Sequence, residues 1–162
     1  NVNASYDGRT ALQAAAGGGH LAVVERLLQE NSDVNAAYAG RTVLQAAAEG
    51  GHLAVVERLL RENADVNAAA SSLGGRTALQ AAAEGGHLAV VERLLRENAD
   101  INAAAAKTAA GGGHLAVVER LLQENADVNA AAAYSGGRTA LQAAAGGGHL
   151  AVVERLRSAG GL

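Results

Sequence analysis

One stretch, GGHLAVVERLL, constrains the fold more than any other part of the chain. It is first found at Gly18–Leu28 and recurs at 50–60, 85–95, 112–122 and 147–157, where the last copy ends in Arg157. The histidines of the five copies are separated by 32, 35, 27 and 35 residues. Self-similarity at such a period is typical of stacked repeat proteins, in which each unit packs on its neighbours.

Each copy is preceded by a segment that predicts a short first helix. A variable turn tip leads into Gly-Arg-Thr and then Ala-Leu-Gln-Ala-Ala-Ala, as at Gly8–Ala16. Thr10 and Gln13 have the spacing of a capping box, so the helix should begin after Thr10. The same pair recurs as Thr42/Gln45, Thr77/Gln80 and Thr139/Gln142. The glycines before these motifs, Gly8, Gly40, Gly75 and Gly137, are expected to need positive φ.

The repeated stretch itself predicts a second, longer helix, from about Leu21 to Glu30. Leu21, Val24, Leu27 and Leu28 share one apolar face of that helix. An asparagine follows the helix, where Asn can adopt the left-handed conformation of a C-cap; these are Asn31, Asn63, Asn98 and Asn125. The predicted fold is an all-α helical repeat solenoid in a single array. Its units are expected at roughly 4–35, 36–67, 68–102, 103–129 and 130–162.

The motif Gly-x-Thr-x-Leu-x-x-Ala-Ala-x-x-Gly-His-Leu-x-Val-Val-x-x-Leu-Leu, followed by Asn-Ala-Asp-Val-Asn, resembles the ankyrin repeat. The resemblance covers nearly the whole chain. The family usually has Thr-Pro-Leu-His where this chain has Thr-Ala-Leu-Gln, so Gln13 and its equivalents should replace the hydrogen bonds of that histidine between units. The family also prefers Gly at the position of Asn31. Near-identical copies of this kind resemble arrays of fungal nucleotide-binding receptors, or a consensus-engineered scaffold.

The fourth unit is shorter than the others, because only twelve residues separate Asn102 from His114. If Lys107-Thr108 replaces Arg-Thr, residues are missing from the first helix. If the helix is aligned without a gap, the tip is nearly absent and Ala106 takes the position of the buried Leu. We favour the second alignment, with a notch in the surface near 103–110. A third possibility is that the sequence lacks residues at this point.

The two ends of the array differ from its middle. Arg157 takes the position of Leu28, which we interpret as a partial C-terminal cap. At the other end, Asn1-Val2-Asn3 is only the tail of a preceding unit, so the first unit should fray. We expect a monomer, with end-to-end association through the uncapped N-terminal face as the risk.

Composition argues against several classes of function. The net charge of −3 disfavours nucleic acid as a partner, and no apolar run is long enough to span a membrane. The absence of Cys fits a reducing compartment such as the cytoplasm. One His per unit is too widely spaced for a shared metal, and the Gly runs lack the Lys-Ser/Thr of a phosphate-binding loop. We therefore expect no cofactor, no metal, no catalytic residue and no enzyme activity.

The sequence differences between units are concentrated in the tips, which contain all three tyrosines. The resemblance implies that the tips and the inner face of the first helices bind a partner protein. That surface comprises Tyr6, Asp7, Arg9, Tyr38, Arg41, Leu73, Arg76, Lys107, Tyr134 and Arg138, with Glu49 and Glu84 on the same side. Tyr and Arg are frequent interface anchors, but the tyrosines could equally pack across neighbouring turns.

Two questions about this surface stay open. The arginines could contact an acidic partner, or hold adjacent turns together through carboxylates such as Asp33, Asp65 or Asp127. Our main hypothesis is a non-enzymatic protein-binding module, and the alternative is an engineered or structural scaffold with no natural ligand.

Overall fold

A computed structural model of the chain describes residues 5–6, 9–37, 40–68, 76–130 and 137–161. The first helices of the five units are, in chain order, α1 (Ala11–Gly17), α3 (Val43–Glu49), α5 (Ala78–Glu84), α7 (Ala103–Gly111) and α9 (Ala140–Gly146). The second helices are, in the same order, α2 (Leu21–Gln29), α4 (Leu53–Arg61), α6 (Leu88–Arg96), α8 (Leu115–Gln123) and α10 (Leu150–Ser158). Two short strands, β1 (Ser5–Tyr6) and β2 (Arg9–Thr10), pair antiparallel at the start of the array.

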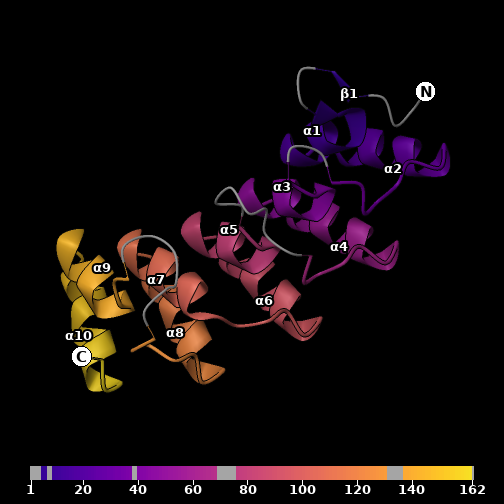
Figure 1. Cartoon of the computed structure of the whole chain (residues 1–162). Coiled ribbons are helices and arrows are strands. Elements are labelled where there is room, and N and C mark those ends of the chain that lie inside the picture. Colours follow the sequence, from indigo (N-terminus) through magenta and orange to yellow (C-terminus); the bar gives the residue numbers. More distant parts are fainter. Residues whose placement is uncertain (1–4, 7–8, 38–39, 69–75, 131–136, 162) are drawn as a thin grey trace.

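The helices form two layers that run from one terminus to the other (Figure 1). Each first helix contacts the first helix of the next unit, and each second helix contacts the next second helix. Within each unit the two helices also contact one another. The predicted all-α repeat solenoid is confirmed. Its core is a continuous strip between the layers.

The first helices begin where the capping boxes predict. Thr42 Oγ1 accepts from the backbone N–H of Gln45 at 3.2 Å, and Gln45 Oε1 accepts from the N–H of Thr42 at 2.8 Å. Complete boxes of the same kind precede α1, α5 and α9. The two bonds satisfy helix N–H groups that have no partner within the helix.

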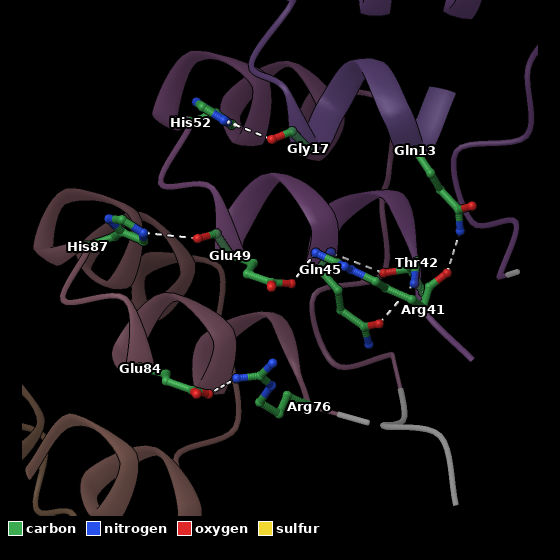
Figure 2. Close-up of polar contacts among 10 residues, drawn as sticks. All are labelled: Gln13, Gly17, Arg41, Thr42, Gln45, Glu49, His52, Arg76, Glu84 and His87. Carbon is green, nitrogen blue, oxygen red and sulfur yellow. Dashed lines mark hydrogen bonds and ion pairs between the residues drawn. The ribbon is translucent and has the colours of Figure 1, made fainter. Parts of the chain in front are cut away.

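The capping glutamines also join one unit to the next, as expected from the replacement of the family's histidine. Gln13 Nε2 donates to the carbonyl oxygen of Arg41 at 2.5 Å (Figure 2), and Gln45 Nε2 donates to the carbonyl of Ala68 at 3.4 Å. Gln80 Nε2 donates to Asn102 Oδ1 at 2.9 Å. Each amide thus caps its own helix with its oxygen. Its nitrogen reaches the following unit from Gln13 and Gln45, and from Gln80 it reaches the N-cap residue of α7.

The core contains small and branched aliphatic side chains that allow the helices to approach closely. Ala16, Ala48, Ala83 and Ala110 are fully buried on the first helices. On the second helices, Val24 is buried as predicted, whereas Leu21 and Leu28 are only half-buried. The predicted face omitted the preceding valine, which is buried as Val55, Val90, Val117 and Val152 in the later units.

The asparagines that follow the second helices have the left-handed conformation that was predicted, with φ of 59° or 60° at Asn31, Asn63, Asn98 and Asn125. Gly40 and Gly137 have positive φ, whereas Gly8 and Gly75 lie outside the described residues. A second set of asparagines joins the return loops. Asn35 Nδ2 donates to the carbonyl of Asn63 at 3.2 Å, and Asn35 Oδ1 accepts from the N–H of Asp65 at 2.8 Å.

The fourth unit follows the alignment without a gap. Helix α7 begins at Ala103, Ala106 is 3% exposed at the Leu position, and Lys107-Thr108 lies inside the helix. Asn102 replaces the usual capping threonine, because its Oδ1 accepts from the N–H of Ala105 at 3.2 Å as well as from Gln80. The equivalent asparagine in earlier units holds the return loop, so the short unit uses Asn102 for a different purpose.

The histidines of the repeated stretch bind the unit before them. Nε2 of His52 lies 3.0 Å from the carbonyl oxygen of Gly17, and Nε2 of His87 lies 3.0 Å from that of Glu49 (Figure 2). His114 and His149 reach Glu84 and Gly111 in the same way. We expected each histidine to bond to nearby backbone, and the bond in fact crosses between units.

The glycines beside these histidines leave room for the rings. A methyl group at Gly50 would overlap the ring of His52, and one at Gly51 would overlap the ring of His87. Gly51 also has φ of 72°, which disfavours any residue with a Cβ. Gly-Gly-His is therefore one structural feature. Its first glycine leaves space for the histidine ring of its own unit, and its second leaves space for the ring of the following unit.

Replacing His87 by Ala should lower the free energy of unfolding by about 1–2 kcal/mol, because a hydrogen bond and ring packing between two units are lost. His20 provides the matched control, since it is exposed and its unit has no preceding unit in this structure. His20→Ala should therefore change stability by less than about 0.5 kcal/mol. Urea unfolding followed by far-ultraviolet circular dichroism measures both, and equal losses would contradict the assignment.

Ser32 is an exception in the return loops. Its Oγ is buried without a hydrogen-bond partner among the described residues, whereas Ala64, Ala99 and Ala126 stand at the equivalent positions. Ser32→Ala should raise the free energy of unfolding by about 1 kcal/mol, because an unsatisfied hydroxyl is removed. The reciprocal variant Ala64→Ser should lower it by a similar amount in the same urea titration. A destabilised Ser32→Ala would show that the hydroxyl has a partner after all.

Candidate partner-binding surface

Two arginines predicted to bind a partner form ion pairs within their own units. Arg41 lies just before α3, and its guanidinium contacts the carboxylate of Glu49 at the end of the same helix (Figure 2). Arg76 and Glu84 repeat this pair across α5. The side chains of both pairs are 37–49% exposed. The pairs therefore present opposite charges side by side along one edge of the first-helix layer.

These contacts differ from both alternatives considered for the arginines, an acidic partner and the return-loop aspartates. Asp65 lies in a return loop, where its Oδ1 accepts from the N–H of Asn67 at 2.9 Å. Asp127 makes the same turn with Asn129. Of the carboxylates within the chain, Arg41 and Arg76 thus pair with the glutamate at the end of their own first helix and not with the return-loop aspartates that were one of the two alternatives.

Arg138 occupies the same position in the fifth unit but in a different environment. The residue equivalent to Glu49 is Gly146, and a Cβ built there would lie 3.7 Å from Nη1 of Arg138. Arg138 is exposed, and among the described residues it forms no ion pair. Its guanidinium therefore lies next to the point from which the glutamate side chain extends in the second and third units.

Lys107 takes the position of the capping glutamine in the short fourth unit. It is half-buried in the middle of α7 and makes its own polar interaction. Thr108, the next residue, donates its hydroxyl to the carbonyl of Ala105 at 3.1 Å. Lys107 is thus part of a helix rather than of a turn tip.

The remaining predicted residues lie in the tips. Tyr6 lies on β1, opposite Arg9 of β2. Asp7, Tyr38, Leu73 and Tyr134 lie outside the described residues. The structure therefore places Arg41, Arg76 and Arg138 at equivalent positions in the second, third and fifth units. Tyr6 and Arg9 belong to the first unit, which precedes these in the array.

The histidine and carboxylate side chains of the described residues are not clustered. Among these residues, no three His, Asp or Glu side chains come together in a way that could hold a metal ion. The histidine rings are instead directed at backbone carbonyls. None of the helices in the described ranges is long and apolar enough to cross a membrane.

Sequence reasoning missed the pairing of Arg41 with Glu49. The signal was present, because the residue at the end of the first helix is Glu in the second and third units and Gly in the others. Eight residues separate the partners, more than the three or four that bring side chains together on one helix, so the path of the chain before α3 brings them together.

The helix–turn–helix units form a two-layer array. Histidine rings and side-chain amides of one unit bind backbone carbonyls of the next or the preceding unit, which defines a solenoid repeat protein. Family models for ankyrin repeats match residues 1–70, 36–105 and 103–157. The chain therefore belongs to the ankyrin repeat family. Members of this family are generally protein–protein interaction modules and typically not enzymes. A search of curated proteins found no match.

Gly146→Glu should place a carboxylate beside Arg138 and so create a third pair of the kind formed by Arg41 with Glu49 and by Arg76 with Glu84. Compared with Gly146→Gln, which makes the same change in helix propensity, it should be more stable by up to about 1 kcal/mol. The difference should shrink as salt is raised from 0.05 to 1 M, because the pair is exposed. Urea titrations of both variants with Arg138 present and in an Arg138→Gln background measure it; a difference that persists without Arg138 would contradict the pairing.

Proposed function

We propose that this chain is a non-enzymatic module that binds a partner protein through its turn tips and the adjoining edge of the first helices. The proposal concerns Tyr6, Asp7, Arg9, Tyr38, Arg41, Leu73, Arg76, Lys107, Tyr134 and Arg138. No nucleic acid, membrane or cofactor is part of it. Membership of the ankyrin repeat family supports the class of function.

The observation that carries the proposal is the internal use of the constant residues. The threonine, glutamine, histidine and second asparagine of the repeat are bound within the array, as in Thr42, Gln45, His52 and Asn35. Variation between units is concentrated instead in the tips and at the end of the first helix. A frame whose polar groups are used internally leaves the variable positions available to determine which protein is bound.

The charges along this edge differ from unit to unit. Arg41 and Arg76 are neutralised by Glu49 and Glu84, whereas Arg138 is exposed beside Gly146. A carboxylate of a partner could therefore occupy the position that glutamate has in the middle units. Arg is well suited to this role because its guanidinium can bind a carboxylate through two hydrogen bonds.

The test compares two sets of substitutions by affinity capture and mass spectrometry. Tyr6→Ala, Tyr38→Ala, Tyr134→Ala and Arg138→Ala remove the proposed anchors together. A captured protein should be lost, with its Kd raised at least about 100-fold, because interface anchors cost about 2 kcal/mol or more each. Far-ultraviolet circular dichroism should be unchanged.

The matched control carries Gln29→Ala, Arg61→Ala and Gln123→Ala, which lie on exposed faces of second helices. It should bind as the unmodified chain does. A partner that is lost from the control and kept by the tip variant would refute the proposed surface. If the unmodified chain captures no protein, the alternative of an engineered or structural scaffold without a natural ligand is favoured.

A further inference from the structure

The array contains two complete copies of one charged site and a further copy that lacks its carboxylate. In the second unit, Arg41 contacts Glu49, the last residue of α3, and the third unit repeats this pair (Figure 2). In the fifth unit, Arg138 takes the position of Arg41, but helix α9 ends in Gly146. The change from Glu to Gly thus removes the carboxylate and keeps the arginine.

The guanidinium of Arg138 already lies where such a pair would form. A Cβ built at Gly146 would lie 3.7 Å from Nη1 of Arg138, and among the described residues it would meet no other atom within 4 Å outside its own helix and its chain neighbours. The C-terminal end of a helix carries partial negative charge, which favours a cation at this place. The arginine is therefore positioned beside an open space at the end of α9.

No acidic residue lies near Arg138 in the sequence. Residues 128–153 contain neither Asp nor Glu, and this range includes the whole tip of the fifth unit. Helix α7 of the preceding unit contains Lys107 and no acidic residue. The first-helix edge of the fourth and fifth units therefore carries positive charge, although the chain as a whole has a net charge of −3.

This edge stays accessible in the middle of the array as well. Helix α3 has a first helix packed on either side of it, α1 and α5. The side chains of Arg41 and Glu49 are nevertheless 37% and 44% exposed. A neighbouring unit therefore leaves the end of a first helix open to another molecule.

We propose that Arg138 binds the carboxylate of an Asp or Glu side chain of the partner protein, in the open position beside Gly146. This inference rests on the proposed function and names the chemistry of the partner segment. The second and third units indicate the ligand, because a carboxylate is what the equivalent guanidinium binds there. A guanidinium can bind a carboxylate through two hydrogen bonds. The fifth unit thus selects for acidic partners, whereas the second and third units supply their own carboxylate.

The first test selects random peptides displayed on phage against the full chain. Asp and Glu should be enriched over the unselected library. Gly146→Glu should abolish this enrichment, because the new carboxylate occupies Arg138. Gly146→Gln is the matched control, since it adds a side chain of the same size without a charge, and it should keep the enrichment. Circular dichroism checks that both variants are folded.

The second test measures the Kd of one selected peptide by fluorescence anisotropy. Arg138→Gln should raise the Kd about tenfold, because the charge pair with the peptide is lost. Replacing the acidic residue of the peptide by its amide should then have little further effect, as expected for two groups that interact directly. Arg61→Gln is the control, since it removes the same charge from an exposed position on a second helix and should change the Kd less than about twofold.

Three results would overturn the inference and leave the proposed function standing. They are selected peptides without acidic enrichment, equal effects of Arg138→Gln and Arg61→Gln, and displacement of the peptide by millimolar inorganic phosphate but not by acetate at constant ionic strength. The last result would assign the position to a phosphate group. If no peptide is enriched, the inference also fails, and the capture experiment above decides the proposed function independently.

Discussion

The contact between consecutive units is the interaction on which the rest of this structure depends. It combines apolar packing of alanine, valine and leucine with polar bridges at three places. His52 reaches back to the carbonyl of Gly17, while Gln13 and Asn35 reach forward to the carbonyls of Arg41 and Asn63. A single pair of short helices could not satisfy these groups or bury its valines. Stability is therefore a property of neighbouring units rather than of each unit alone.

The backbones of neighbouring units approach closely, which explains why the sequence of the repeat is so uniform. Gly50 and Gly51 leave space for two imidazole rings, and Ala48 is fully buried between first helices. A larger residue at any of these places would have to displace a ring or a neighbouring helix. The outer surface follows a looser rule, because ion pairs such as Arg58–Glu62 and Arg93–Glu97 are partly exposed and join an arginine to the glutamate just after its own helix. Such pairs contribute little to stability.

Much of the fold could be predicted from the sequence because its signals are local. The capping box joins Thr42 and Gln45, which are three positions apart, and the left-handed cap at Asn63 depends on one residue. Contacts across units could not be placed in this way. The carbonyl partner of His87 and the pairing of Arg41 with Glu49 depend on where the preceding unit and the chain before α3 lie. The short fourth unit lay between these cases, since the sequence left two alignments of its first helix open. The cap at Asn102 decides it, because an asparagine can begin a helix without the Thr-x-x-Gln motif.

The same division between frame and tips bears on how such a chain can acquire binding specificity. Substitution of a frame residue such as His52 removes a contact between two units and so lowers the stability of both. Substitution at the end of a first helix changes only an exposed contact, as the exchange of Glu49 for Gly at position 146 illustrates. The edge can therefore vary in charge from unit to unit at little cost in stability. Side chains on this edge can therefore change without affecting the fold, because the bonds that hold the units together lie elsewhere, at the helix starts, the Gly-Gly-His turns and the return loops.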